Sequence, residues 1–575
     1  MKKRFKTLFV CFVVINSVYS QIIIDNPNIY MKIENDAITS IKNKLVNKYQ
    51  SWHVDSCALY LMEVNSPNVI ATLNVSSNTE NQVELVLTIK NNSASSVDVS
   101  TVFPYIKGLY FPPGLNSNLY YLYPKQGHSY SNVDVKYDCA YSRWFQMQFM
   151  DVYDKYYGGF YLLTDDRSNY PKRYFLEKKS GKIDMKVTYQ VKTLQPGETW
   201  VLPTAIIGTQ ANDWHDALAA YKQRLTKWHQ PKTPRKDWFR DIYNFRQVFL
   251  HTNFGEKGAW NPLTKNIDIL SRIEEDKNVF GGVDYVHIFD WMREPEDRIY
   301  NYEPWNYLGG DANLRNQISA LQNQGIKVGF YYQGYKINKH SRIGKLSGSD
   351  WQIRDTLNNP QGDGVYLYPC AYVEPWQNYL SNLILNTTNS FNLNGAYVDV
   401  FGIGLEYQCY SPLHGHPSKK GKVINNFQVQ GEGNMLQKIK NTIPESVVLY
   451  DEEMPSDVST QYLDGSFTSS VRNSKGASNN PSGINLARFA FPDFKLFEIL
   501  AIDRPVGEDT LGVKKVFFNG SGLWIAGPLN DSGWFPESVR KLIRKTYSIL
   551  NQNKEAFRST DPVPLVPTVN SKIHA

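Results

Sequence analysis

Two different patterns of apolar and polar residues divide the chain into an N-terminal and a C-terminal part. Up to about residue 209, short apolar and polar stretches are separated by turn signals, as in residues 82–90, 184–194 and 199–209. This periodicity is typical of β-strands packed in sheets, and no long helical pattern interrupts it. The pattern predicts an N-terminal β-sandwich domain over residues 21–209.

Residues 213–229 then place apolar side chains three and four positions apart, which predicts an amphipathic helix. A joint rich in proline and lysine, residues 230–236, follows this helix. We therefore interpret residues 210–236 as a linker helix and joint between two domains.

From residue 237 to about 560, short apolar runs alternate with helical patterns such as 311–325 and 425–442. Eight runs are strand candidates: 245–250, 283–289, 326–332, 395–401, 446–452, 463–469, 495–501 and 521–527. Eight β/α units in this length predict a (β/α)8 TIM barrel. A doubly wound parallel sheet is the alternative, but no G-x-G-x-x-G motif follows the first strand.

The two ends of the chain differ from these domains. Residues 1–20 combine four basic residues with a short apolar run, which predicts a signal peptide and export to the periplasm or the extracellular space. No later stretch is long and apolar enough to predict a membrane span. Residues 561–575 are expected to open a truncated C-terminal β domain.

Composition narrows the class of protein. The predicted signal holds four of the 62 basic residues and none of the 55 acidic ones, so the net charge of +7 falls to about +3 without it. That charge gives no indication of nucleic-acid binding. The 38 Tyr, 28 Phe and 13 Trp residues suit sugar binding, although β-rich extracellular proteins are also aromatic. The four cysteines beyond the signal, at positions 57, 139, 370 and 409, form neither a disulfide scaffold nor a zinc-type pair spacing.

Polar residues gather where four consecutive predicted strands end, the edge at which TIM barrels build active sites. They are Asp290 and Trp291, Tyr332 and Gln333, Asp399, and then Asp451, Glu452 and Glu453. Two carboxyl groups that face one pocket suggest glycoside hydrolysis, in which one donates a proton and the other attacks or activates water. Asp399 and Glu452 follow neighbouring strands and are expected to form such a pair.

Each of these acids also has a simpler explanation. Asp399 on its own resembles a turn acid, Asp290 resembles a helix cap, and the acidic run 451–453 resembles a solvated loop. Together these acids indicate an active site more strongly than any one of them does, because the strand bodies are apolar and the strand ends are polar.

The stretch "CYSPLHGHP" (409–417) adds two histidines, His414 and His416. They are candidate metal ligands, but the sequence indicates no third ligand. We favour a substrate-binding loop over a metal site, with a purely structural loop as the other alternative. The sequence predicts no metal and no cofactor, and it does not indicate whether a structural calcium ion binds or which oligomeric state forms.

"GAYVDVFG" (395–402), the histidine loop and a next strand ending in Glu resemble bacterial TIM-barrel glycosidases of glycoside hydrolase families 101 and 129. The resemblance covers most of residues 21–575. It implies a retaining α-glycosidase with Asp399 as nucleophile, Glu452 or Glu453 as acid/base, and Asp290 holding sugar hydroxyls. Strand continuity favours Glu452, whereas counting back from residues 463–465 favours Glu453.

Family 129 includes α-N-acetylgalactosaminidases and enzymes that release 3,6-anhydro-D-galactose from carrageenan oligosaccharides. The signal and the Lys- and Asn-rich composition favour the second activity by analogy. The expected partner is therefore an oligosaccharide. A non-catalytic carbohydrate-binding barrel is the alternative.

Overall fold

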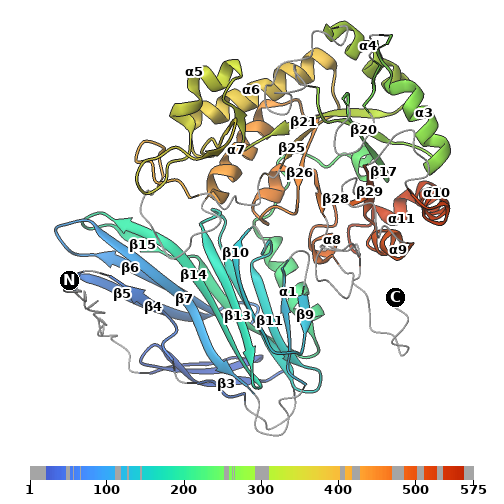
Figure 1. Ribbon diagram of the computed structural model, residues 1–575. Helices are drawn as coiled ribbons and strands as arrows, with labels where there is room; N and C mark the ends of the chain where they lie inside the picture. Colours follow the sequence, from blue (N-terminus) through green and yellow to red (C-terminus); the bar gives the residue numbers. More distant parts are fainter. Residues whose placement is uncertain are drawn as a thin grey trace, which may run out of the picture.

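The computed structural model describes residues 21–562, except for 47–51, 56, 65, 111–117, 126–128, 143–144, 252–257, 262, 265, 292–309, 400, 402–407, 417–427, 469–484, 501–509 and 527–534. An N-terminal body of antiparallel sheets precedes a closed parallel barrel surrounded by helices (Figure 1). The predicted signal (1–20), and residues 563–575 of the expected C-terminal β domain, lie outside the described residues.

The N-terminal body is a sandwich of two main sheets with a smaller sheet beside them. The small sheet holds β1 (Gln21–Asp25), β2 (Ile29–Glu34) and β3 (Ala37–Asn43). One main sheet has the order β10 (Val135–Tyr141), β13 (Lys172–Lys179), β14 (Lys182–Leu194), β7 (Val97–Leu109) and β4 (Leu61–Glu63). The other contains β5 (Val69–Ser77), β6 (Val83–Asn91), β8 (Tyr120–Tyr123), β9 (Ser129–Ser131), β11 (Phe149–Asp154), β12 (Gly158–Asp165), β15 (Thr199–Val201) and β16 (Thr204–Gln210).

The two main sheets pack together through the side chains that alternation places on their inner faces. In β6, every second side chain from Val83 to Ile89 is buried, and these side chains share one core with the buried face of β14. This pattern is the one expected of sheets that cover each other on one face. The predicted sandwich is confirmed, with the difference that the predicted strand 199–209 is split into β15 and β16 around Pro203, which lacks an N–H for the ladder.

Two helices connect the sandwich to the barrel. Helix α1 (Trp214–Leu225) begins where the side chain of Asp213 accepts a hydrogen bond from the backbone amide of His215. Its apolar face is buried, as the spacing in the sequence predicts. Helix α2 (Asp237–Arg240) follows, and the first barrel strand begins at Asn244.

The barrel contains the eight strands that the apolar runs predict. They are β17 (Asn244–Val248), β20 (Tyr285–Ile288), β21 (Lys327–Gln333), β25 (Gly395–Asp399), β26 (Val448–Glu452), β27 (Gly465–Thr468), β28 (Lys495–Leu500) and β29 (Gly522–Ile525). Neighbours pair in parallel, and β29 pairs with β17 to close the ring. The TIM-barrel prediction is therefore confirmed, and closure excludes the doubly wound sheet.

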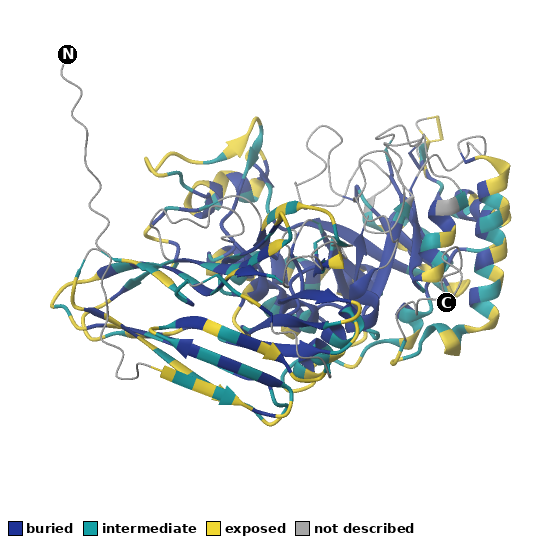
Figure 2. Cartoon of the chain, turned by 90° about the horizontal axis from the view of Figure 1, so that it is seen from below, coloured by how far each residue is buried: buried dark blue, intermediate teal, exposed yellow. Residues whose placement is uncertain are grey.

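Helices cover the outside of this ring (Figure 1). The longer ones are α3 (Ile269–Phe280), α4 (Gly310–Asn323), α5 (Arg342–Trp351), α6 (Glu374–Phe391), α7 (Val429–Thr442), α9 (Thr510–Phe518) and α10 (Glu537–Gln552). Short elements complete the body: β18 (Trp260–Asn261), β19 (Asn266–Ile267), β22 (Ile337–Asn338), β23 (Gly362–Asp363), β24 (Tyr366–Leu367), η4 (Ser459–Tyr462), α8 (Leu486–Ala490) and α11 (Lys554–Phe557). The barrel strands are buried on both sides, whereas exposed residues lie on the outer faces of the sandwich and the helices (Figure 2).

Aromatic side chains fill the barrel interior. Phe245 stacks on Trp524 with ring centroids 4.2 Å apart, and on Tyr285 at 4.6 Å. The Tyr285 hydroxyl occupies space that a side chain at Gly329 or Gly395 would need, since a Cβ there would lie 1.8 or 2.4 Å from it. These two glycines therefore allow a large aromatic core at the amino end of β25.

The sandwich and the barrel meet at the segment that follows β26. Asp457 is buried and accepts hydrogen bonds from the hydroxyls of Tyr141 (2.6 Å) and Tyr221 (2.7 Å) and from the side-chain and backbone nitrogens of Gln148. Asn169 of the sandwich accepts from the Ser456 hydroxyl at 2.6 Å. The N-terminal domain therefore holds the segment that begins directly after Glu452.

Within the described ranges, no helix is long and apolar enough to cross a bilayer.

The domain contact predicts a large effect for Asp457→Ala. The change removes a buried acceptor that two tyrosine hydroxyls and the Gln148 groups share, so we expect the free energy of unfolding to fall by about 3 kcal/mol. Urea unfolding followed by tryptophan fluorescence measures this difference. Asp561→Ala, at a side chain that is 91% exposed, is the matched control. Equal midpoints for both variants would contradict the anchoring role.

Candidate functional site

Asp399 ends β25 and lies among hydrogen-bond donors from two strands. Side chains alternate along a strand, so Asp399 shares the inward side of β25 with Tyr397, whose ring packs on His287 and Trp524. The Tyr397 hydroxyl donates to Asp399 Oδ1 at 2.9 Å. From the adjacent β21, the Tyr331 hydroxyl and the Gln333 side-chain nitrogen both donate to Oδ2 at 2.7 Å. Three donors from two strands thus orient this carboxylate.

Glu452 ends the next strand, β26, and faces Asp399. Tyr450, two residues earlier, packs on Phe245 and Trp524 inside the barrel, so Glu452 also points inward. The two carboxyl groups are hydrogen-bonded to each other. Burial raises the pKa of Glu452 well above its usual range, and the neighbouring charge of Asp399 raises it further. The raised pKa favours the protonated form of Glu452, the form that can donate a proton.

The neighbours of Glu452 lie in different surroundings. Asp451 is buried, with a pKa raised by burial, and alternation directs it to the opposite side of β26. Glu453 follows the strand with φ at 63°, and its backbone amide donates to the carbonyl of Phe467 at 2.7 Å. The left-handed backbone at Glu453 marks a sharp turn. Glu452 is therefore the residue of this acidic run that meets Asp399.

The other predicted site residues separate into two groups. Gln333 is buried and contacts Asp399 directly, as described above. Asp290 is also buried, and its carboxylate accepts hydrogen bonds from the backbone amides of Leu250 and His251, beyond the end of β17. Asp290 thus fixes the segment after the first barrel strand, and its contact with sugar hydroxyls stays a prediction.

Trp291 and Tyr332 pack in the layer between strands and helices. The Trp291 indole stacks on Phe330 at 5.0 Å, and the Tyr332 hydroxyl meets Thr387 of α6 at 2.5 Å. In β21, Tyr331 and Gln333 point inward, so alternation directs Tyr332 outward. These contacts explain both aromatic residues by packing, and their role in substrate binding stays a prediction.

His414 and His416 lie beside two buried cysteines. One ligand atom each of Cys370, Cys409, His414 and His416 lies within 4.8 Å of the other three. The Cys409 sulfur is 3.2 Å from His414 Nδ1, and hydrogen bonds from Cys370, His414 and His416 lower the pKa of the Cys409 thiol. The sequence indicates no third ligand beside the two histidines, whereas the fold supplies two thiols. Their part in a substrate loop stays a prediction.

Sequence reasoning missed the two tyrosines that donate to Asp399. Tyr397 and Tyr331 lie two residues before Asp399 and Gln333, respectively. Counting back by two from each polar strand end would have identified both as inward-facing.

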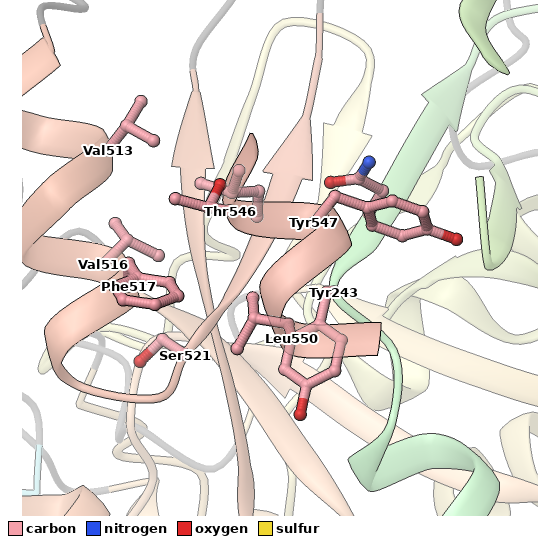
Figure 3. Close-up of a pocket in the computed structure, with 10 residues that line it drawn as sticks. Tyr243, Val513, Val516, Phe517, Ser521, Thr546, Tyr547 and Leu550 are labelled. Atoms are coloured by element: carbon pink, nitrogen blue, oxygen red, sulfur yellow. The ribbon is translucent and has the colours of Figure 1, made fainter. Parts of the chain in front are cut away.

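A small cavity of about 10 Å³ lies elsewhere in the barrel domain (Figure 3). It lies between helices α9 and α10 and the starts of β17 and β29, and Val513, Val516, Thr546 and Leu550 line it. Its volume suffices for about one water molecule. It is a gap in packing and contains no carboxyl group.

A family model described as "Domain of unknown function (DUF6259)" matches residues 201–496, just over half of the chain. The chain belongs to this family. The DUF6259 match runs from β15 to β28 and therefore includes both Asp399 and Glu452. No curated protein matches the chain.

Solved structures share the fold of this DUF6259 protein at low sequence identity. An α-N-acetylgalactosaminidase, NagBb from Bifidobacterium bifidum in complex with GalNAc, is 13% identical with a TM-score of 0.62, covering 92% of this chain and 93% of that one. The α-galactosidase AgaA from Geobacillus stearothermophilus is 11% identical with a TM-score of 0.56, covering 94% and 71%. The galactosidase domain of AgaSK is 12% identical with a TM-score of 0.55, covering 91% and 69%. These likenesses extend over sandwich and barrel together.

The raised pKa of Glu452 predicts a pH-dependent effect of Glu452→Gln. The native state keeps the Glu452 proton at pH values where the unfolded chain releases it, so the contribution of Glu452 to stability falls as the pH rises above about 4.5. Glutamine does not titrate, so the free energy of unfolding of the variant is expected to increase relative to that of the wild type between about pH 4 and about pH 8. Urea unfolding of the variant and the wild type at both pH values measures this difference in the free energy of unfolding.

The control for this measurement is Glu445→Gln, at a side chain that is 66% exposed. This variant should follow the wild type at both pH values. A Glu452→Gln curve parallel to the wild type would show that Glu452 is not held protonated.

Proposed function

We propose that this protein is a retaining exo-α-glycosidase that releases terminal galacto-configured sugars. The observation that carries the proposal is the Asp399–Glu452 pair, with its hydrogen bond and the raised pKa of Glu452. Retaining glycosidases need a close pair of carboxyl groups, about 5–5.5 Å apart, whereas inverting enzymes leave a wider gap for water. Asp399 is close enough to Glu452 to raise its pKa through its charge and a hydrogen bond, which supports the close arrangement.

The proposed reaction has two steps. Asp399 Oδ attacks the anomeric carbon while Glu452 donates its proton to the glycosidic oxygen, so that the leaving group departs as an alcohol. Glu452, now ionised, accepts a proton from water, which attacks the glycosyl–Asp399 ester and releases the sugar. Both carboxyl groups return to their starting protonation states.

The surroundings of Asp399 fit a nucleophile. Tyr331, Gln333 and Tyr397 hold its two oxygens from both sides, so the carboxylate is positioned before substrate arrives. All three donors are uncharged groups, so they position the carboxylate without a cation that would weaken its attack.

The sugar is proposed from similarity. The resemblance to family 129 enzymes and the predicted export signal favour 3,6-anhydro-D-galactose at the non-reducing end of carrageenan oligosaccharides. The likeness to a GalNAc complex of NagBb supports α-N-acetylgalactosamine as the second candidate. Both are galacto-configured sugars in α-linkage.

The product anomer tests the proposal. We expect ¹H NMR of reactions with carrageenan-derived oligosaccharides and α-N-acetylgalactosaminides to show hydrolysis of one class, with the α-anomer appearing first. Retention follows from two displacements at one carbon. Initial release of the β-anomer would contradict the retaining mechanism, and binding without hydrolysis would favour a carbohydrate-binding barrel.

Asp399→Asn is the control for this assay. It keeps the shape of the side chain but removes the nucleophile, so kcat/KM should fall by at least about 1,000-fold. Circular dichroism should show an unchanged fold. Near-normal turnover of a folded variant would remove Asp399 from the mechanism.

Paired substitutions separate Glu452 from Glu453. Glu452→Gln should lower kcat by about 100-fold or more on natural glycosides, and much less on aryl glycosides whose leaving groups need little protonation. Glu453→Gln is the matched control and should keep most of the activity on both. The reverse ranking would transfer the acid/base role to Glu453.

A further inference from the structure

The cysteine and histidine cluster lies where two segments of the barrel domain meet. Cys370 lies between β24 and α6, and Cys409, His414 and His416 come from the segment that follows β25. Three of the four side chains are buried and His416 is partly exposed. None of the described cysteines forms a disulfide.

The spacing of the ligand atoms fits a small tetrahedral ion. Zinc bonds of about 2.3 Å to sulfur and 2.0–2.1 Å to nitrogen place tetrahedral ligand atoms roughly 3.3–3.8 Å apart. Cys409 Sγ and His414 Nδ1 are 3.2 Å apart, and all four atoms lie within 4.8 Å of one another. Small side-chain rotations therefore bring the set to zinc geometry.

The groups behind the ligands orient them toward a common centre. His414 Nε2 lies 3.0 Å from the carbonyl oxygen of Asp350, to which it donates, and this leaves the Nδ1 lone pair facing Cys409. An imidazole held by a backbone carbonyl at its outer nitrogen is the usual arrangement of a metal-binding histidine. Backbone amides of Tyr372 and Arg354 hydrogen-bond to the sulfurs of Cys370 and Cys409, respectively. The His416 ring packs against Tyr372 with centroids 4.8 Å apart.

We propose that Cys370, Cys409, His414 and His416 bind one zinc ion in a closed, structural site. Two thiolates and two imidazoles are a common zinc donor set, and they disfavour calcium and magnesium, which take oxygen ligands. Four protein ligands fill a tetrahedron and leave no position for a reacting water. The site therefore lies outside the proposed glycosidase chemistry and does not depend on it.

The ion would join two segments at one end of the barrel. The segment carrying three ligands leaves β25 after Asp399, and the fourth ligand precedes α6, the helix before that strand. A cross-link here limits the motion of chain on both sides of β25. Zinc binding is thus expected to stabilise the barrel domain rather than to participate in bond cleavage.

Metal analysis of the full chain tests the site. We expect protein purified without chelators to contain about one zinc per chain by inductively coupled plasma mass spectrometry. Cobalt exchanged into the wild type should give the strong visible bands of tetrahedral cobalt and a thiolate-to-cobalt charge-transfer band. This measurement needs no variant and therefore does not depend on the folding of one.

Single substitutions test which cysteines bind the metal ion. Cys409→Ser should lose the charge-transfer band and most of the zinc, whereas Cys57→Ser, at a cysteine outside the cluster, should keep both. Absence of zinc and cobalt binding in reduced, folded wild-type protein would overturn the proposal. A Cys370–Cys409 disulfide, mapped by peptide mass spectrometry in protein isolated without reductant, would also overturn it.

Discussion

Two carboxyl groups in contact inside a protein cannot both be ionised without a large electrostatic cost, and the candidate site depends on how this cost is divided. The hydroxyls of Tyr331 and Tyr397 and the amide of Gln333 donate to Asp399, which stabilises charge there. Glu452 is held at the next strand end, where burial and the charge of Asp399 favour its protonated form. The raised pKa of Glu452 thus arises first from its burial and then from the neighbouring charge of Asp399.

The rest of the fold fixes the positions of these two strand ends. Gly329 and Gly395 make room for Tyr285, so the interior below Asp399 is packed with aromatic rings. Beyond Glu452, Asp457 is bonded to Tyr141 and Tyr221 of the N-terminal body and linker helix. The sandwich therefore restrains the segment after one carboxyl group while the barrel core supports the strands that carry both. This coupling gives a physical reason for the two domains to occur together.

Sequence patterns predicted the fold closely because barrel strands are buried on both faces. Each of the eight apolar runs overlaps one strand of the ring, and the strand-end rule selected Asp399, Glu452 and Gln333. The same rule included Trp291 and Tyr332, whose neighbours in space are Phe330 and Thr387. The rule included them because a position at a strand end does not show which side of the strand a residue faces. Alternation from Tyr397 and Tyr450 supplies that direction and also separates Glu452 from Glu453.

The cysteine and histidine cluster shows a different limit of sequence reasoning. Cys409, His414 and His416 are close in the chain, but Cys370 lies before α6 and β25, so no local spacing connects it to the others. Only the return of the chain through a β/α unit brings its thiol beside Cys409. The same β/α unit carries Asp399 at the end of its strand. A metal-ligand set built across that unit and a nucleophile at its strand end therefore share one structural requirement, a fixed path of the chain on either side of β25.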